Sequence, residues 1–302
     1  MIPIPNYLPC FSVLKTNIYL HSKEGFFENY LFSKLSWVQK REIAKLLGVS
    51  ERLVYYYSTG KRKCSLNRMI KIAEYRNLKT FLEDAYRNFS GISTQGHKQS
   101  KLPKEYSYEL AYLAGFIAGD GHVSKRSEIM FVNDSKDIIH EIIPKFVDFV
   151  FGVKLRFRKE GNYYRAVLNS KQIHVFFNKV IGFPAGKKKG SLRVPCFIYL
   201  SDEYKIGFLQ GLFDSDGGVT LSKGKLSILY SSSTKEFLLQ VQALLEGFSV
   251  KMGGPYASGG KKGMELRTYS KSQIKMFSDK IRYYHPKKLE RINATVAQWR
   301  SR

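Results

Sequence analysis

Two aspartates at matching positions of a duplicated segment are the residues of this chain whose type and spacing most directly suggest chemistry. Asp120 is the eighth residue of the run LAGFIAGDG (113–121), and Asp216 is the eighth residue of LQGLFDSDG (209–217). The runs share Leu, Gly, Asp and Gly at equal positions, and the aspartates lie 216 − 120 = 96 residues apart. A separation of this size indicates that a domain-sized unit is duplicated.

Small residues recur every four positions in front of each aspartate. They are Ala111, Gly115 and Gly119 in the first copy and Gly207, Gly211 and Ser215 in the second. On a helix this spacing makes one flat face, so two such helices can approach closely and bring Asp120 and Asp216 side by side. Two carboxylates beside two helix C-terminal poles repel each other unless a cation is present, and oxygen ligands suit Mg²⁺. The alternative is that both Asp-Gly pairs only end two core helices as turn residues; the matching small faces favour the cation site.

The elements that position these aspartates repeat as well. Residues 128–133, 153–159 and 163–169 are predicted strands of the first copy, with helices at 137–151 and 171–181 and a turn at Gly161. The second copy predicts strands at 226–230 and near 264–269, and helices at 235–247 and 273–283. Strands in hairpins make antiparallel sheets, so the fold class is α+β.

A polar segment that ends at Pro103 divides the chain. We therefore expect an all-α domain at residues 1–90, a linker at 91–103 and the duplicated domain at 104–302, with repeats at 104–200 and 201–302.

The two aspartate runs resemble the signature motifs of the LAGLIDADG homing endonucleases, single-chain subclass, and the resemblance covers about residues 104–302. It implies a pseudo-twofold pair of αββαββα units in which Asp120 and Asp216 bind the catalytic Mg²⁺ ions, for which Mn²⁺ can substitute. The carbonyls of Gly119 and Ser215 would be further ligands. Ala118 departs from the family consensus, which has Asp there as in Asp214, but that motif position is not a metal ligand in the family.

The same resemblance places one lysine of each repeat near the cleavage centre, after a Gly-x-Pro or His-Pro segment. The candidates are Lys187, Lys188 and Lys189 in the first repeat and Lys287 and Lys288 in the second. Such a lysine could orient or deprotonate the attacking water, or balance charge on the phosphate. Plain solvation or phosphate contact is the alternative for each residue of these basic runs.

Basic residues alternate with apolar ones in the predicted hairpins. The candidate DNA-reading residues are Lys154, Arg156, Arg158, Tyr163, Arg165 and Asn169 in the first copy and Glu265, Arg267 and Tyr269 in the second. A two-stranded ribbon fits the major groove, where Arg, Asn and Glu can read base edges. An ordinary solvated sheet face would alternate in the same way.

The first hundred residues contain a second candidate DNA-binding module. Residues 39–57 predict two short helices joined at Gly48, the second capped by Ser50, and this pattern resembles the helix-turn-helix of the Cro/repressor family. The second helix would read DNA with Ser50, Glu51, Arg52, Tyr55 and Tyr56, while Lys61, Arg62 and Lys63 would contact phosphate. Contacts to protein alone are the other use of this geometry.

The composition agrees with a nucleic-acid partner. Fifty Lys and Arg against 25 Asp and Glu give a net charge of +25. The three cysteines fit neither a zinc site nor a disulfide framework, and we find no signal peptide and no membrane span, so we expect an intracellular, cytoplasmic protein.

Together these features predict a monomeric, Mg²⁺-dependent endonuclease that cuts both strands of a long asymmetric DNA site. The resemblance further implies intron homing and cuts across the minor groove that leave 3′ overhangs. A DNA-binding transcriptional regulator and an intron RNA maturase, with RNA as partner, are the alternatives on the same fold.

Overall fold

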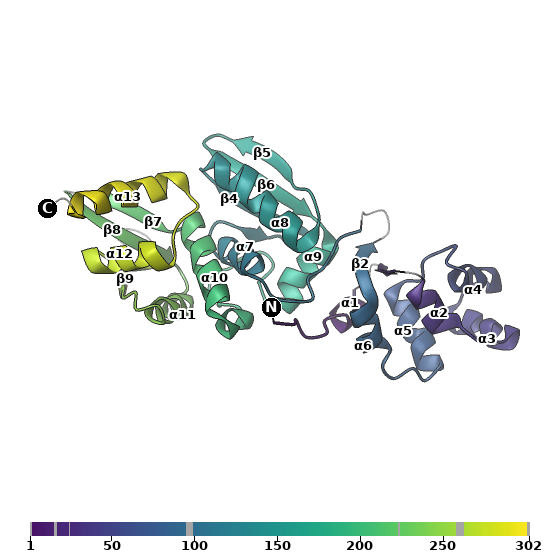
Figure 1. Ribbon diagram of the computed structural model, residues 1–302. Helices are drawn as coiled ribbons and strands as arrows, with labels where there is room; N and C mark the ends of the chain where they lie inside the picture. Colours follow the sequence, from purple (N-terminus) through teal and green to yellow (C-terminus); the bar gives the residue numbers. More distant parts are fainter. Residues whose placement is uncertain are drawn as a thin grey trace. The chain divides into compact units, whose positions relative to one another are not determined.

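The computed structural model describes residues 2–14, 17–23, 25–94, 99–222, 224–257 and 263–300. They form two compact units (Figure 1). The C-terminal unit contains residues 1–3, 105–169 and 176–302, and the N-terminal unit contains residues 4–104 and 170–175. No described helix is long and apolar enough to cross a membrane.

The C-terminal unit is built from two repeats with the same order of elements. Repeat one contains α7 (Tyr108–Ala118), β3 (His122–Val123), β4 (Glu128–Asn133), a π-helical turn (Ile138–Ile142) that leads into α8 (Ile143–Phe151), β5 (Arg156–Glu160) and β6 (Tyr163–Asn169). Its last helix begins as α9 (Lys171–Val175), which belongs to the N-terminal unit, and continues as a π-helical turn (Phe176–Val180). A 3-10 helix (Cys196–Leu200) leads into repeat two.

Repeat two contains α10 (Asp202–Ser215), β7 (Gly218–Ser222), β8 (Lys225–Ser232), α11 (Lys235–Glu246), β9 (Gly253–Ala257), β10 (Met264–Thr268) and α12 (Lys271–Lys280), followed by α13 (Pro286–Arg300). The two antiparallel sheets have equivalent strand orders, β3-β4-β6-β5 and β7-β8-β10-β9. The predicted α+β class with duplicated units and antiparallel sheets is confirmed.

One face of each sheet forms the core of its repeat. In repeat one Ile129, Phe131, Ala166 and Leu168 are buried at alternate strand positions, as period-two patterning requires. The π-helical turn at Ile138–Ile142, which leads into α8, packs against strands β4 and β6. The opposite face of each sheet is left for polar side chains.

Helices α7 and α10 pack against each other along the small residues predicted for this role. A Cβ atom on Gly115 would lie 1.9 Å from the backbone oxygen of Phe208, and one on Gly211 would lie 2.1 Å from that of Tyr112. Since real side chains cannot approach backbone so closely, the close approach depends on glycine at these positions. The predicted face-to-face packing of the two helices is confirmed.

The N-terminal unit contains α1 (Pro9–Ser12), β1 (Ile18–Ser22), α2 (Phe26–Phe32), α3 (Trp37–Leu47), α4 (Glu51–Ser58), α5 (Leu66–Tyr75), α6 (Phe81–Asn88) and β2 (Phe89–Thr94). The prediction that this region is all-α is wrong in one respect, because β1 and β2 pair as an antiparallel ribbon. Strand β2 also extends into the predicted linker at 91–103, so the linker cannot begin at residue 91. Residues 95–98 of that linker lie outside the described residues.

Candidate active site and DNA-facing surfaces

Asp120 and Asp216 lie at the adjoining C-terminal ends of α7 and α10. A Cβ atom on Gly119, the C-cap of α7, would be 2.1 Å from the hydroxyl of Ser215 and 3.1 Å from the Cβ of Asp216. Both aspartates keep solvent-exposed surface at the paired helix ends, although the carboxyl group of Asp120 is partly shielded from water. The structure therefore brings together the two aspartates and the two backbone positions, Gly119 and Ser215, that the sequence singled out.

One lysine from each basic run reaches the end of its own motif helix. The ammonium of Lys188 donates to the carbonyls of Ile117 (2.5 Å), Ala118 (3.2 Å) and Gly119 (2.6 Å). The ammonium of Lys288 donates to the carbonyls that correspond to them in α10, those of Phe213 (2.8 Å), Asp214 (2.8 Å) and Ser215 (3.2 Å). These carbonyls carry the negative pole of each helix, so each lysine neutralises a helix end.

Burial and charge shift the pKa values in this centre. Burial lowers the pKa of Lys188 to about 8, against the opposing effect of the carboxylates of Asp120 and Asp216. Burial also lowers the pKa of Lys288. The pKa of Asp120 is raised by burial, although the charges of both lysines oppose the shift. The three carbonyl acceptors around each amine favour its ammonium form, which has three N–H bonds to donate.

The other candidate lysines lie elsewhere. Lys187 and Lys189 are exposed. Lys287 is also exposed and forms an ion pair with Asp134 at 3.5 Å. The structure thus distinguishes Lys188 and Lys288 from their neighbours in the two runs, which the sequence could not do.

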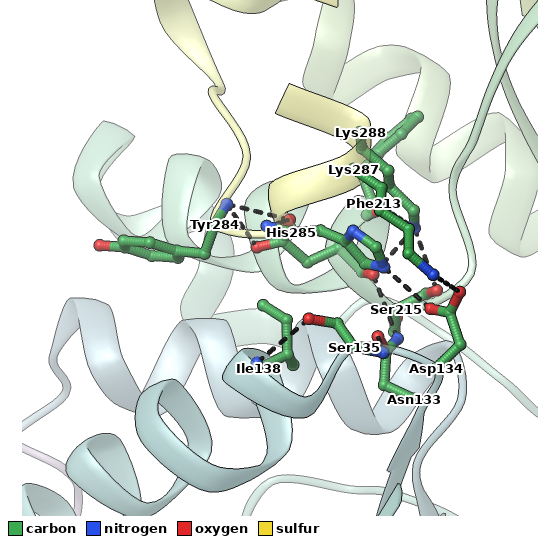
Figure 2. A network of polar contacts seen from close by, with 11 residues as sticks. Asn133, Asp134, Ser135, Ile138, Phe213, Ser215, Tyr284, His285, Lys287 and Lys288 are labelled. Carbon is green, nitrogen blue, oxygen red and sulfur yellow. Dashed lines mark hydrogen bonds and ion pairs between the residues drawn. The ribbon is translucent and has the colours of Figure 1, made fainter. Parts of the chain in front are cut away.

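Asp214 is fully buried and organises the segment before α13. Its carboxylate accepts hydrogen bonds from the backbone amides of Tyr284 (3.1 Å) and His285 (3.0 Å) and from the hydroxyl of Tyr112 (2.9 Å). Burial raises the pKa of Asp214 to about 6, and these hydrogen bonds oppose the shift. Figure 2 shows Tyr284, His285 and Lys288 gathered at the end of α10.

Two further residues beside this centre were not predicted. Nε2 of His285 lies 2.9 Å from a carboxylate oxygen of Asp134, in a contact that joins the loop after β4 to the segment before α13 (Figure 2). The hydrogen bond from His285, with the charges of His285 and Lys287, lowers the pKa of Asp134 although burial alone would raise it. The His-Pro pair at 285–286 was a visible signal for His285, whereas Asp134 follows a strand without any distinguishing pattern.

The donor set at the helix ends fits Mg²⁺. This ion is commonly held by one or two carboxylates together with water and substrate phosphate, so Asp120 and Asp216 suffice on the protein side. Among the described residues, no three His, Cys, Asp or Glu side chains gather into a closed metal-binding cluster.

The polar face of the first sheet carries most of the predicted DNA-reading residues. Lys154, Arg156, Arg158 and Tyr163 are exposed, and in the β5–β6 register Arg158 pairs with Arg165. Phe157, on the other face, stacks on the ring of His140 at 4.6 Å. Arg165 forms an ion pair with Glu160 at 2.8 Å, and the amide of Asn169 lies between Glu128 and Arg156. All of β5 is exposed, Phe157 included, so this strand has no buried apolar face of the kind that its alternation of apolar and basic residues indicates.

The second sheet presents a less basic face. Glu265 and Arg267 form an ion pair at 3.0 Å, and Arg267 also donates to the hydroxyl of Tyr269 at 2.8 Å. Thr220 and Ser227 face each other across β7 and β8, with their hydroxyls 2.7 Å apart. The polar faces of the two sheets thus differ in chemistry, with arginines on one sheet and a Glu-Arg-Tyr group with hydroxyls on the other.

In the N-terminal unit, two short helices follow each other at the predicted positions. Helix α3 ends at Gly48, which has a left-handed φ of 62°, and Ser50 caps α4 by accepting from the amide of Leu53 at 3.3 Å. Ile43, Ala44 and Val54 are buried between these helices and their neighbours. The helices are as expected from the sequence, while their role in DNA binding stays a prediction.

The predicted contact residues around α4 have these surroundings. Ser50, Arg52 and Tyr55 are exposed, and Glu51 and Tyr56 are half-buried. Glu51 pairs with Arg41 at 3.0 Å, and Arg52 donates to the hydroxyl of Tyr56 at 2.7 Å. Lys61, Arg62 and Lys63 are exposed in the loop that follows, with Lys63 bonded to His21 at 2.5 Å.

A family described as "LAGLIDADG-like domain" matches residues 107–181 and 203–282, one segment in each repeat. The chain is also 27% identical over 214 residues to glutamine–fructose-6-phosphate aminotransferase (isomerizing) of Methanocaldococcus jannaschii, covering 70% of this chain and 19% of that protein. It is 28% identical over 194 residues to ribonucleoside-diphosphate reductase NrdEB subunit alpha of Bacillus subtilis, covering 59% and 17%. The chain thus spans less than a fifth of the length of these relatives.

Two solved structures align with parts of this chain. The crystal structure of I-DmoI in complex with DNA and Mn aligns with 58% of this chain and 97% of its own, at 18% identity and a TM-score of 0.45. The crystal structure of full-length DUF199/WhiA from Thermatoga maritima aligns with 64% of this chain and 60% of its own, at 18% identity and a TM-score of 0.45.

Proposed function

We propose that this chain, which belongs to the LAGLIDADG-like domain family, is a site-specific DNA endonuclease that cuts both strands of a long target in the presence of Mg²⁺. The observation that supports this most is the pairing of Asp120 and Asp216 at the joined helix ends, each helix end also bound by a lysine. A pair of oxygen-rich centres related by internal repetition suits a substrate with two strands.

The chemistry would be hydrolysis of one phosphodiester bond in each strand. A bond forms between a water oxygen and phosphorus, the bond from phosphorus to one sugar oxygen breaks, and a proton passes from the water to solvent while the leaving oxygen gains one. When bound by Asp120, Asp216 and the carbonyls of Gly119 and Ser215, Mg²⁺ (or Mn²⁺) would supply Lewis acidity and an acidified water.

The lysines would contribute positive charge at a fixed place. The ammonium groups of Lys188 and Lys288 lie next to the aspartates and would face the extra negative charge that develops on the phosphate during attack. To act as a base, either amine would first have to release a proton and one of its carbonyl partners. We therefore assign both residues an electrostatic role.

The remaining surfaces would hold the DNA. The basic face of β5 and β6 and the Glu265-Arg267-Tyr269 group would each read one half of an asymmetric site. Helix α4 and residues 61–63 would bind further along the duplex. Because both repeats are in one chain, we expect a monomer to be active, and we assign the protein to the cell interior.

The matches to these relatives favour a shared domain over a shared enzymatic activity. Their names describe an aminotransferase and a ribonucleotide reductase, and this chain matches less than a fifth of each. We therefore infer that the matched region is a unit carried by several otherwise different proteins and that their metabolic reactions do not transfer to this chain.

The test starts without a known target. The double variant Asp120→Asn, Asp216→Asn should bind DNA without cutting it, so it can be used to select bound duplexes from a random library. The wild-type protein should then cut the selected duplex in both strands with Mg²⁺, leaving 3′ overhangs, and the double variant should not. Full cleavage by the double variant would refute the assigned active site.

The alternatives give different results in the same experiment. A DNA-binding regulator would select a duplex that the wild-type protein never cuts in Mg²⁺ or Mn²⁺. A maturase would bind structured RNA in preference to any duplex in a direct competition at equal salt. Matching the salt is necessary because phosphate contacts make both affinities salt-dependent.

A further inference from the structure

The two motif helices differ at the position two residues before their terminal aspartates. Repeat one has Ala118 there, and repeat two has the fully buried Asp214. A buried carboxylate is costly unless hydrogen bonds compensate for lost water. Asp214 has three donors, Tyr112 and the amides of Tyr284 and His285, so the structure compensates this charge at one centre only.

The carboxylate of Asp214 fixes the start of α13. The two amides that it binds directly precede Pro286, the first residue of that helix, and a negative charge at a helix N-terminus is stabilised by the helix dipole. Lys288 lies in the first turn of α13, and its ammonium donates to the carbonyls of residues 213–215 at the end of α10. Helices α10 and α13 are thus joined by two opposite contacts, carboxylate to amide and ammonium to carbonyl.

Tyr112 extends this arrangement to the other repeat. Its hydroxyl donates to Asp214, and its ring packs edge-on against the rings of Tyr284 (5.6 Å) and Phe146 (5.0 Å). Tyr112 is fully buried in α7. The side chain of Asp214 is therefore held on one side by a rigid helix residue while its other contacts hold the segment that leads to Lys288.

Lys188 reaches the same kind of position by other means. Its segment is held by backbone hydrogen bonds, from the amide of Gly186 to Val123 (2.7 Å) and from Ser191 to the carbonyl of Lys188 (3.1 Å). Gly186 has a φ of 92°, a backbone conformation that favours glycine. Ala118, at the position that corresponds to Asp214, has no carboxylate that could bind the segment before Lys188. A glycine loop therefore presents Lys188, whereas a capped helix presents Lys288.

We propose that Asp214 is a positioning residue that holds Lys288, and not Lys188, in place, so that the two strands of the DNA are cut by centres that can be weakened separately. This inference rests on the proposed nuclease function for its effect on cleavage. The placement of Lys288 itself can be measured without any cleavage.

The cleavage experiment uses a selected duplex labelled differently in its two strands. Lys188→Met and Lys288→Met first identify the strand that depends on each lysine. Asp214→Ala, which copies Ala118, should then slow the Lys288 strand on the order of tenfold to a hundredfold, since ångström-scale misplacement costs this much. The Lys188 strand should change less than about twofold, so that nicked DNA accumulates.

Two variants with different mechanisms make the result specific. Asp214→Asn keeps the shape and one acceptor oxygen, so it should slow the same strand to a smaller extent. Gly186→Ala strains the other loop at its φ of 92° and should slow the Lys188 strand instead. Equal slowing of both strands by Asp214→Asn, with unchanged DNA affinity, would overturn the proposal by showing a merely structural role.

The second measurement is the rate of reductive methylation of each lysine in the intact protein, followed by mass spectrometry. Lys288 should react several-fold faster in Asp214→Asn than in wild type, with Lys188 unchanged. Unchanged Lys288 labelling would overturn the proposal. If labelling changes as expected but the wild-type protein cuts no DNA, the nuclease function fails while the positioning role of Asp214 stands.

Discussion

Gly115→Ala is the substitution for which the structure predicts the largest effect from the smallest chemical change. The added methyl group would lie 1.9 Å from the backbone oxygen of Phe208 and 2.9 Å from the backbone nitrogen of Leu212. Ordinary contact begins at about 3.4 Å, so the two atoms must separate by 3.4 − 1.9 = 1.5 Å. Because the obstacle is helix backbone, no side-chain rotation can relieve the overlap, and α7 must move away from α10.

The expected cost follows from packing and from position. Overpacking of a core usually costs about 1–3 kcal/mol, and a rigid backbone obstacle places this variant at or above the upper end. The aspartates sit at the ends of the same two helices. A shift of roughly 1 Å between catalytic groups costs on the order of a hundredfold in rate, so cleavage should fall by that much even where the variant remains folded.

The assay is urea unfolding followed by cleavage of the selected duplex well below the transition. The matched control is Gly263→Ala, whose methyl group would be 3.6 Å from the nearest heavy atom, the carbonyl oxygen of Ser232. The control should match wild type within about 1 kcal/mol. If Gly115→Ala also stays within that margin and retains full cleavage, the two helices do not pack as closely as described.

Three other predictions concern charge and exposure. Burial raises the pKa of the Cys64 thiol from its ordinary 9.0 to about 12. At pH 8 the Cys64 thiol of the native protein should therefore be alkylated about a thousandfold more slowly than an ordinary thiol, and the rate should rise as the pH approaches 12. Fast labelling of native Cys64 would contradict its burial in the N-terminal core. Arg156→Ala should cost about 1–3 kcal/mol of binding free energy at particular base pairs if Arg156 reads guanine. Lys61→Ala should weaken binding to all sequences alike and flatten the slope of log affinity against log salt concentration by roughly 0.9. Uniform weakening by Arg156→Ala would show that this arginine contacts phosphate. Mn²⁺ should bind at least about tenfold more tightly to the DNA complex than to the free protein in calorimetry, because phosphate completes the ligand set; equal affinity would show that the protein alone forms the site.

The sequence predicted the helix pair because its signal is local and strict. Small residues at four-residue intervals in two copies are typical of helices that pack backbone to backbone, and Gly115 and Gly211 meet the partner backbone as expected. Strands β4 and β6 were predicted with their observed bounds because each is a short run rich in aromatic and β-branched residues. These features depend on residues close together in the chain.

The features that the sequence did not predict depend on distant residues. Strand β1 pairs with β2 across about seventy residues, and β2 lies in a polar stretch that reads as a linker. The helices predicted at 137–151 and 171–181 contain π-helical turns at Ile138–Ile142 and Phe176–Val180. No residue type in these segments predicts a π-helical turn. Tertiary pairing decides such cases, so local patterns carry little information about them.

The candidate active site shows the same distinction for the lysines. Within each basic run the residues are chemically equal, and only the path of the chain determines that Lys188 and Lys288 turn inward while Lys187, Lys189 and Lys287 are exposed. Sequence reasoning also held that two carboxylates beside two helix poles require a cation. The structure supplies two, because each ammonium binds the carbonyls at one pole.

This arrangement changes the argument for the metal. Asp120 and Asp216 carry two negative charges, and the ammonium groups of Lys188 and Lys288 place two positive charges beside them, so part of the repulsion between the carboxylates is offset before any metal binds. A divalent cation would add further positive charge, which a DNA phosphate from each strand can offset. The carbonyls of Gly119 and Ser215 can accept a lysine and still face a metal, since a carbonyl oxygen has two lone pairs. Because the lysines offset part of the negative charge in the free protein, we expect the metal to bind more tightly once DNA supplies its phosphates.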